Sequence, residues 1–173
     1  MLSNNVQGKR TFDRLKWGYA YLLIIAGLVI IVDQVSKLLV REYLAIGEAW
    51  VPWESISDYA VIVHTWNTGA TLGVLRGTNG LFIAISEIAC IVILFLYPRI
   101  IKQRNILPIG LGLGLILGGA AGNLIDRVAV GYVTDIFLIA NLPVFNLADF
   151  CIILGALFLA MALIFDPPIT AEG

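Results

Sequence analysis

The sequence has few charged residues, since lysine, arginine, aspartate and glutamate together make up 13% of its 173 residues. Soluble domains carry roughly a quarter charged residues. The hydrophobic fraction is 60% and the mean hydropathy is +0.92. This composition predicts an integral membrane protein and excludes an ordinary soluble enzyme. The net charge of −1 argues against a nucleic-acid partner.

Histidine and cysteine are also scarce. His64 is the single histidine, and the two cysteines, Cys90 and Cys151, lie inside apolar runs. Their spacing does not match a metal site, so we expect no metal and no cofactor, and we interpret both cysteines as buried apolar residues.

Long apolar segments are abundant. Each approaches the ~20 residues that a membrane-spanning helix needs. The basic residues before the first segment resemble the start of a signal peptide, but no small-residue cleavage site follows, so we expect a retained span. The sequence thus predicts an all-α membrane protein forming one domain over residues 1–173, with four transmembrane helices at about 17–40, 77–97, 105–125 and 146–165.

Basic residues indicate the orientation of these spans, because they accumulate in cytoplasmic segments. They lie before the first span and between the second and third: Lys9, Arg10, Arg14, Lys16, Arg99, Lys102 and Arg104. We therefore expect both termini in the cytoplasm, with loops of about 41–76 and 126–145 on the outer side. Three of the four tryptophans lie in the first outer loop, where they favour the membrane interface.

Two local patterns add detail to this topology. Residues 59–66 are rich in β-branched and aromatic types and predict a strand, followed by a turn at 67–70, so we expect a small extracytoplasmic β-structure. His64 within the strand is interpreted as structural. In the third span, Gly110, Gly114, Gly118 and Gly122 form a small-residue face, which predicts close helix packing, with dimerisation as the alternative.

Polar residues gather at the outer ends of the predicted spans. Residues three or four apart share a helix face, and this spacing occurs at the ends of the first, third and fourth spans. The residues concerned are Asp33, Ser36 and Lys37, then Asn123, Asp126 and Arg127, and finally Asn146 and Asp149. Asp135 lies between the last two groups in a predicted loop. Ionisable residues at a membrane are costly, so this convergence predicts a functional site at one interface.

Several of these residues also have a simpler explanation. The pairs Asp33–Lys37 and Asp126–Arg127 can be charged helix ends that anchor at the interface. Asn146 can be an N-cap, with Asp149 favoured in the first turn by the helix dipole. Asp135 is harder to explain this way, because its neighbours are apolar. Glu87, in the middle of the second span, receives no role.

Two neighbouring aspartates can perform acid–base hydrolysis. A like charge disfavours the second ionisation, so one carboxylate stays ionised and activates water while the other keeps a proton and binds a carbonyl oxygen. Protonation belongs to the coupled pair, and the sequence does not assign it to one residue. The helix N-terminus favours an ionised Asp149, which makes a protonated Asp135 our hypothesis.

Five motifs together resemble the bacterial lipoprotein signal peptidase family, also called signal peptidase II. They are DQVSK at 33–37, NTGA at 67–70, GGAAGNLIDR at 118–127, GYVTDIF at 131–137 and FNLADF at 145–150. They occur in the family's order and extend from the first span to the fourth.

The resemblance implies an aspartic endopeptidase of the bacterial cell membrane that cuts diacylglyceryl-modified prolipoproteins before the lipidated cysteine. Asp135 and Asp149 match the catalytic dyad. Asn67, Asn123, Arg127 and Asn146 match polar residues that line the site, while Asp33, Lys37 and Asp126 match supporting positions. The implied partners are prolipoprotein substrates and membrane lipids, and the implied protein is a monomer with its active site at the outer face and no cofactor.

The residues themselves leave two alternatives to a peptidase open. A small proton-coupled transporter or channel subunit would also place ionisable residues in spans, and Glu87 is its best support. The polar residues cluster at one interface rather than along a pathway, which argues against it. A structural scaffold explains the glycine face but leaves Asp135 unexplained.

Overall fold

The computed structural model describes residues 2–68 and 79–165. Within these ranges, four helices are long and apolar enough to cross a membrane. They are α1 (Leu2–Tyr43), α2 (Asn79–Gln103), α3 (Ile106–Ala129) and α4 (Leu147–Phe165). A sheet contains β1 (Ala49–Trp50), β2 (Ala60–Asn67) and β3 (Val133–Ile139), and a short 3-10 helix covers Glu54–Ile56. The predicted fold class, four membrane helices with a small β-structure, is confirmed.

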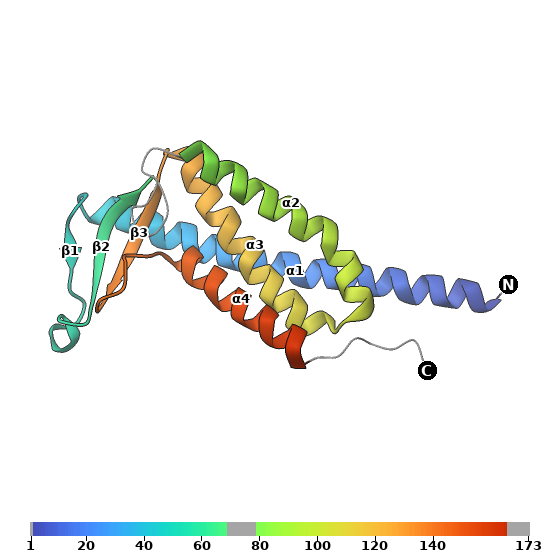
Figure 1. Cartoon of the computed structure of the whole chain (residues 1–173). Coiled ribbons are helices and arrows are strands. Elements are labelled where there is room, and N and C mark those ends of the chain that lie inside the picture. The colour runs from blue at the N-terminus through green and yellow to red at the C-terminus, as the bar shows by residue number, and fades with distance from the viewer. Residues whose placement is uncertain (1, 69–78, 166–173) are drawn as a thin grey trace.

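The helix α3 is the centre of the bundle, and α1, α2 and α4 pack around it (Figure 1). The interior holds apolar side chains such as Leu22, Leu113 and Leu117. Large apolar side chains also cover the outside of α1, including Ile24 and Leu28. An apolar exterior on all spans is expected where the solvent is lipid rather than water.

The glycines of α3 permit this close packing. A Cβ atom on Gly114 would lie 2.8 Å from Cβ of Ile25, and one on Gly118 would lie 2.7 Å from the carbonyl oxygen of Ala26, both on α1. On another face of α3, Gly112 approaches the backbone of Leu159 on α4 in the same way. Close helix packing through these glycines, predicted from the sequence, is confirmed.

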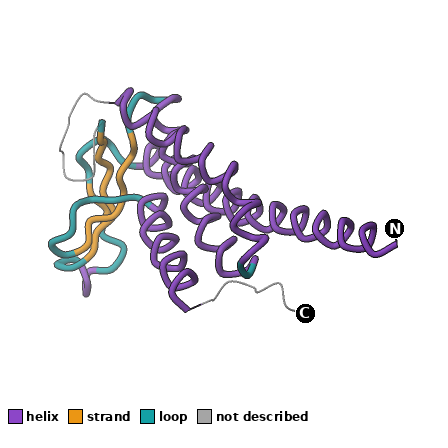
Figure 2. Tube along the Cα trace, turned by 45° about the vertical axis from the view of Figure 1, so that its right-hand side comes forward, coloured by secondary structure: helices purple, strands orange, loops and turns teal. Residues whose placement is uncertain are grey.

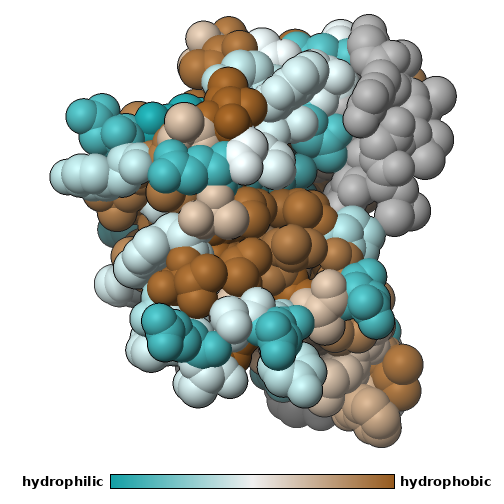
Figure 3. All heavy atoms as spheres, turned by 90° about the vertical axis from the view of Figure 1, so that its left-hand side faces the viewer, coloured by the Kyte–Doolittle hydropathy of each residue, from teal (hydrophilic) through white to brown (hydrophobic). Residues whose placement is uncertain are grey.

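The sheet covers one end of the bundle, and α1 begins and α4 ends at the opposite end (Figures 1 and 2). The strands are antiparallel in the order β1-β2-β3, with Thr65 opposite Asp135 and Asn67 opposite Val133. The pairing of β2 with β3 is irregular between Ile62 and Thr65. Viewed from this end, the surface has an apolar area between regions of polar side chains (Figure 3).

Helix boundaries differ from the predictions because apolarity marks the part of a helix that suits a membrane, not the whole helix. The first helix extends beyond the predicted 17–40 at both ends, and α3 continues past residue 125 to Ala129. Helix α2 continues through Pro98 and the basic residues as far as Gln103. Its predicted start at residue 77 lies outside the described residues.

Two predictions about the outer segments were wrong. Asn67 is the last residue of β2 rather than the start of a turn, and the rest of the predicted turn beyond Thr68 lies outside the described residues. Asp135 lies in a strand, β3, and not in a loop. Its apolar neighbours are explained by this strand, because successive side chains point to opposite faces of a strand and Val133 and Ile136 are buried on the two faces of β3.

Candidate active site

Asp135 and Asp149 lie on one pocket of about 320 Å³ at the sheet end of the bundle. Asp135 comes from the middle of β3 and Asp149 from the first turn of α4. The sequence places them 14 residues apart, and the tertiary structure directs both side chains into the same space. Helices α2 and α3 and strand β2 supply the other walls, so the pocket combines carboxylates with a largely apolar lining.

Asp149 belongs to a reciprocal capping arrangement at the start of α4. Its backbone N–H donates to Oδ1 of Asn146 at 2.9 Å, and the backbone N–H of Asn146 donates to Oδ2 of Asp149 at 3.4 Å. Asn123 on α3 donates from Nδ2 to Oδ1 of Asp149 at 2.8 Å. The predicted N-cap is therefore present, and both carboxylate oxygens of Asp149 accept hydrogen bonds. Together with the positive end of the helix dipole, these donors favour a negative charge on Asp149.

Asp135 is held by two amide side chains. Oδ1 accepts a hydrogen bond of 2.9 Å from Nδ2 of Asn146, and Oδ2 accepts one of 3.4 Å from Nδ2 of Asn67. Burial raises the pKa of Asp135 to about 7, with a further increase from the charge of Asp149, while the two amides and Lys37 oppose this shift. Asp135 therefore keeps its proton to a much higher pH than an exposed aspartate does.

Arg127 supplies a positive charge to the same pocket. It is 9% exposed, and its guanidinium lies over the ring of Phe82 at 5.2 Å from the ring centre. Its Nη1 atom donates a long hydrogen bond of 3.5 Å to the carbonyl oxygen of Asn123. Among the described residues, no hydrogen-bond partner is found for the buried Nε atom of Arg127. A guanidinium held in this way has a donor available for a ligand in the pocket.

The three residues expected to support the site lie behind the pocket, in the interior of the bundle. Lys37 and Asp33 are fully buried and Asp126 is 1% exposed. They contact each other between α1 and α3. The nine residues proposed from the sequence therefore divide into a group at the pocket wall or next to it and a buried group of three.

Three further polar residues contact the buried group and were not predicted from the sequence: Gln34, Arg41 and Thr134. Gln34 donates to Asp33 and to the carbonyl oxygen of Gly122, both at 3.1 Å. Arg41 donates to Oγ1 of Thr134 at 3.1 Å and to Asp126 at 3.3 Å. The helical spacing could have identified Arg41, which lies four residues after Lys37 on the same face.

Other residues singled out by type do not line the pocket of the two aspartates. His64 is buried in β2, where Nδ1 donates to the carbonyl oxygen of Leu44 at 2.7 Å. Glu87 is exposed on the outside of α2 and faces neither the bundle interior nor a polar lumen. Cys151 is buried as expected, whereas Cys90 is only partly buried. Within residues 2–68 and 79–165, no group of three or more acidic, histidine or cysteine side chains could hold a metal ion.

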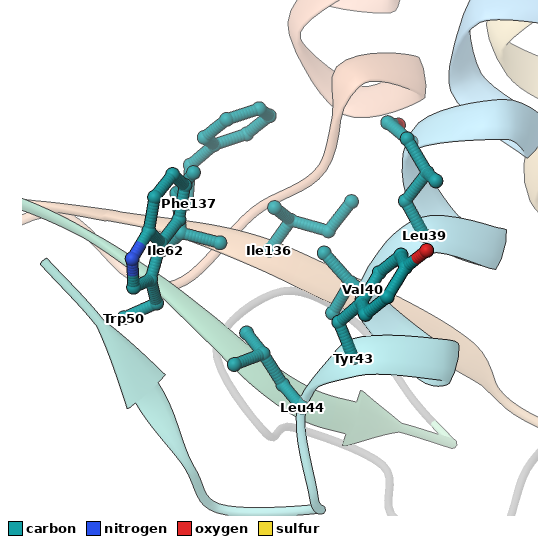
Figure 4. A pocket seen from close by; sticks show the side chains of 9 residues that line it. Leu39, Val40, Tyr43, Leu44, Trp50, Ile62, Ile136 and Phe137 are labelled. Atoms are coloured by element: carbon teal, nitrogen blue, oxygen red, sulfur yellow. The ribbon is translucent and has the colours of Figure 1, made fainter. Parts of the chain in front are cut away.

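A second pocket, of about 490 Å³, lies between the end of α1 and the sheet (Figure 4). Leu39, Val40 and Tyr43 line it from α1, while Trp50 and Ile136 come from β1 and β3. Its walls are almost wholly apolar. Ile136 follows Asp135 directly, so β3 separates this apolar pocket from the pocket that contains the aspartates.

Comparison with known proteins gives consistent matches over most of the chain. A family model described as signal peptidase (SPase) II matches residues 25–165. The chain is 41% identical over 140 residues to the lipoprotein signal peptidase of Halothermothrix orenii, covering 81% of this chain and 92% of that one. It is 39% identical over 134 residues to that of Dehalococcoides mccartyi, covering 76% and 81%. A bacterial membrane enzyme solved by the in meso method has a TM-score of 0.74 at 28% identity, covering 83% and 87%.

Proposed function

Because this chain belongs to the signal peptidase II family of aspartic endopeptidases, we propose that it removes signal peptides from diacylglyceryl-modified prolipoproteins. The proposed cut is on the N-terminal side of the lipidated cysteine. One observation carries the assignment to particular residues: Asp135 and Asp149 reach one pocket from separate elements, and each is held by asparagine side chains. Asp135 and Asp149 are the proposed catalytic dyad.

The two carboxylates have different environments, and this difference defines the proposed reaction. Ionised Asp149 takes a proton from water, and the oxygen of that water attacks the carbonyl carbon of the scissile peptide bond. Asp135 donates its proton to the carbonyl oxygen, which gives a neutral tetrahedral diol. When the C–N bond breaks, Asp149 returns a proton to the leaving nitrogen and Asp135 recovers one from the diol hydroxyl. The dyad is then restored without a covalent intermediate.

The remaining polar residues of the pocket have binding and orienting roles in this proposal. Asn67 and Asn146 orient Asp135, while Asn123 orients Asp149. Arg127 directs its free donor toward a carbonyl oxygen of the substrate. The apolar wall formed by Phe82, Ile85 and Ile152 suits the side chains of a signal helix or the acyl chains of the lipidated cysteine.

We place the sheet end of the bundle at the outer face of the bacterial membrane and both termini in the cytoplasm. Basic residues support this orientation, because Arg14, Lys102 and Arg104 lie near the end of the bundle opposite the sheet. Arg14 donates to the carbonyl oxygens of Ile101 and Arg104, at 2.8 and 2.6 Å. In this orientation a lipidated cysteine at the outer interface meets the dyad while its acyl chains remain in the bilayer, and the protein acts as a monomer.

Cleavage by the purified protein tests this function. The wild-type chain is reconstituted into sealed vesicles with a diacylglyceryl-modified prolipoprotein, and the product is identified by mass. We expect a cut directly before the lipidated cysteine, and a loss of at least about 1,000-fold in kcat for Asp135→Asn and Asp149→Asn. Glu87→Gln is the matched control, since Glu87 is an exposed carboxylate on α2 and its loss leaves cleavage unchanged.

Two outcomes would reject the proposal. Near-normal cleavage by either folded dyad variant would show that the dyad is assigned to the wrong residues. Movement of protons or solute across the vesicle membrane by a wild-type protein that cuts nothing would favour the transporter alternative.

A further inference from the structure

A buried cluster of charged side chains connects α1 to α3 directly behind the pocket. Nζ of Lys37 lies 2.8 Å from Oδ2 of Asp33, 3.2 Å from Oδ2 of Asp126 and 3.0 Å from Oδ1 of Asn123. An ammonium group has three N–H donors, so these three acceptors satisfy all of them. We call these four residues the Lys37 cluster.

The two carboxylates of the Lys37 cluster also bind the backbone next to the proposed dyad. Oδ1 of Asp33 accepts a hydrogen bond of 3.0 Å from the backbone N–H of Ala148, the residue before Asp149. Oδ2 of Asp126 accepts one of 3.0 Å from the backbone N–H of Thr134, the residue before Asp135. Each dyad residue therefore follows a residue whose amide is fixed by a carboxylate, and Lys37 joins the two carboxylates.

A third connection leads from Lys37 to a dyad side chain. The ammonium binds the carbonyl oxygen of the Asn123 amide, and the nitrogen of the same amide donates to Asp149 at 2.8 Å. The bond from Lys37 fixes which end of Asn123 points toward Asp149. Without it the amide could rotate and turn its oxygen toward the carboxylate, which would repel it.

The cost of burying these charges argues that they do more than stabilise the bundle. Arg41 lies 3.3 Å from Oδ1 of Asp126, so two cations balance two carboxylates. Even balanced, a buried ion pair is often no more stabilising than apolar side chains of similar volume. Elsewhere α1 and α3 pack through glycine and apolar residues. The charged contact occurs where the two dyad segments meet the bundle.

We propose that Lys37 is the positioning residue of the dyad: it sets the separation and orientation of Asp135 and Asp149 through Asp33, Asp126 and Asn123. Lys37 does not touch the substrate. Its role rests on the proposed function, because it positions the two carboxylates that we assign to catalysis. A displacement of about 1 Å at a reacting group can lower the rate about 100-fold, so this role is measurable.

Single removal of Lys37 would leave buried carboxylates unpaired and could prevent folding. The test therefore uses charge-balanced double variants. Asp33→Asn/Lys37→Gln keeps an acceptor for Ala148 and a donor for Asn123, whereas Asp33→Asn/Lys37→Met keeps only the acceptor. A second pair, Asp126→Asn/Arg41→Gln, neutralises the other carboxylate of the Lys37 cluster together with Arg41, the cation outside the cluster that balances it and that is 19% exposed.

The readout is kcat and KM for the prolipoprotein, measured on protein that elutes as one species and unfolds cooperatively in detergent. We expect the Met variant to lose about 100-fold in kcat with KM changed less than about threefold, and the Gln variant to recover part of that loss. Tyr97→Phe is the control, because it removes a buried 2.9 Å hydrogen bond to Gly18 from the α1–α2 contact. The Tyr97→Phe variant should have a lower unfolding temperature and an unchanged kcat.

A purely structural cluster would give a different result. If the Gln and Met variants fold and both keep wild-type kcat, the positioning role is wrong, whereas the dyad assignment still holds if Asp135→Asn is inactive. If neither variant folds, the test uses Asp126→Asn/Arg41→Gln. A lowered kcat in that variant supports the positioning role, and an unchanged kcat rejects it. Failure of the wild-type protein to cleave any prolipoprotein would instead reject the proposed function.

Discussion

Asn146 connects the two aspartates: its Nδ2 atom donates to Oδ1 of Asp135 at 2.9 Å, while its Oδ1 atom accepts from the backbone N–H of Asp149 at 2.9 Å. One amide side chain thus caps α4 and orients the carboxylate of β3. An asparagine suits this position because it carries a donor and an acceptor on the same planar group. Neither aspartate nor serine provides both at this reach.

Substitution of Asn146 separates its two functions. Asn146→Ser retains a good N-cap but removes the donor to Asp135, so kcat should fall on the order of 10- to 100-fold with little change in stability. Asn146→Ala loses the cap as well and should lower the free energy of unfolding by a further ~1 kcal/mol. Parallel kinetics and thermal unfolding of the two variants check this. Equal stability of Ser and Ala at position 146 would contradict the capping role.

The pH dependence of cleavage should report the proton on Asp135. Its pKa is raised to about 7 by burial and by the charge of Asp149. Below that pH the dyad holds one proton and is competent; above it Asp135 ionises and the rate falls. The profile of kcat/KM against pH should therefore have an alkaline limb near pH 7. A rate that stays level to pH 9 would show that the proton of Asp135 is not required.

The same pKa predicts a pH-dependent stability. The folded-state pKa of Asp135 lies above its unfolded value, so its stabilising contribution is complete below about pH 4 and is lost as the pH rises through about 7. Asp135→Asn carries no such proton. The difference in unfolding free energy should thus shift in favour of the variant by up to ~1.4 kcal/mol per pH unit in this window. Unfolding curves in detergent from pH 4 to 9 measure this difference, and a constant difference would contradict the raised pKa.

Position 122 should not tolerate even the methyl group of alanine in place of glycine. A Cβ atom there would lie 2.6 Å from Oδ2 of Asp33, the oxygen that binds Lys37. Gly122→Ala should therefore displace Asp33, lower the unfolding temperature and reduce kcat. Gly27→Ala on α1 is the control, because no atom beyond the adjoining residues and the backbone of its own helix lies within 4 Å of its added Cβ. That variant should match or slightly exceed wild-type stability, since alanine favours helix by up to ~1 kcal/mol. Equal behaviour of the two would contradict a tight Gly122–Asp33 contact.

Arg127 should contribute to substrate binding more than to the chemical step. Its guanidinium lies over Phe82 and lines the pocket. Arg127→Lys keeps the charge but loses the planar group that stacks on the ring and the Nε donor. We expect KM to rise about tenfold with a smaller change in kcat. Steady-state kinetics check this split, and a loss confined to kcat would place Arg127 in the reaction instead.

Much of the site could be predicted from the sequence because the relevant residues recur at helical spacing. Asp33 with Lys37 and Asn123 with Arg127 share helix faces, and Asn146 precedes an apolar run at the N-cap position. The strand that contains Asp135 could not be predicted from the sequence. A single strand of seven residues whose alternation is masked by apolar neighbours cannot be distinguished from a loop without its partner, β2.

The sequence by itself determined that this protein has four helices suited to a membrane, and it determined the side-chain types of the site. Hydropathy and helical spacing are local properties, so the four spans and the paired polar positions follow from short stretches of chain. Only the tertiary structure decided that Lys37 reaches Asn123, 86 residues away, and that Asp126 binds the amide preceding Asp135. The first contact depends on how closely α1 and α3 approach across the glycine face, and that distance is set by packing between segments far apart in the chain. The second depends on how the chain turns after α3 to begin β3.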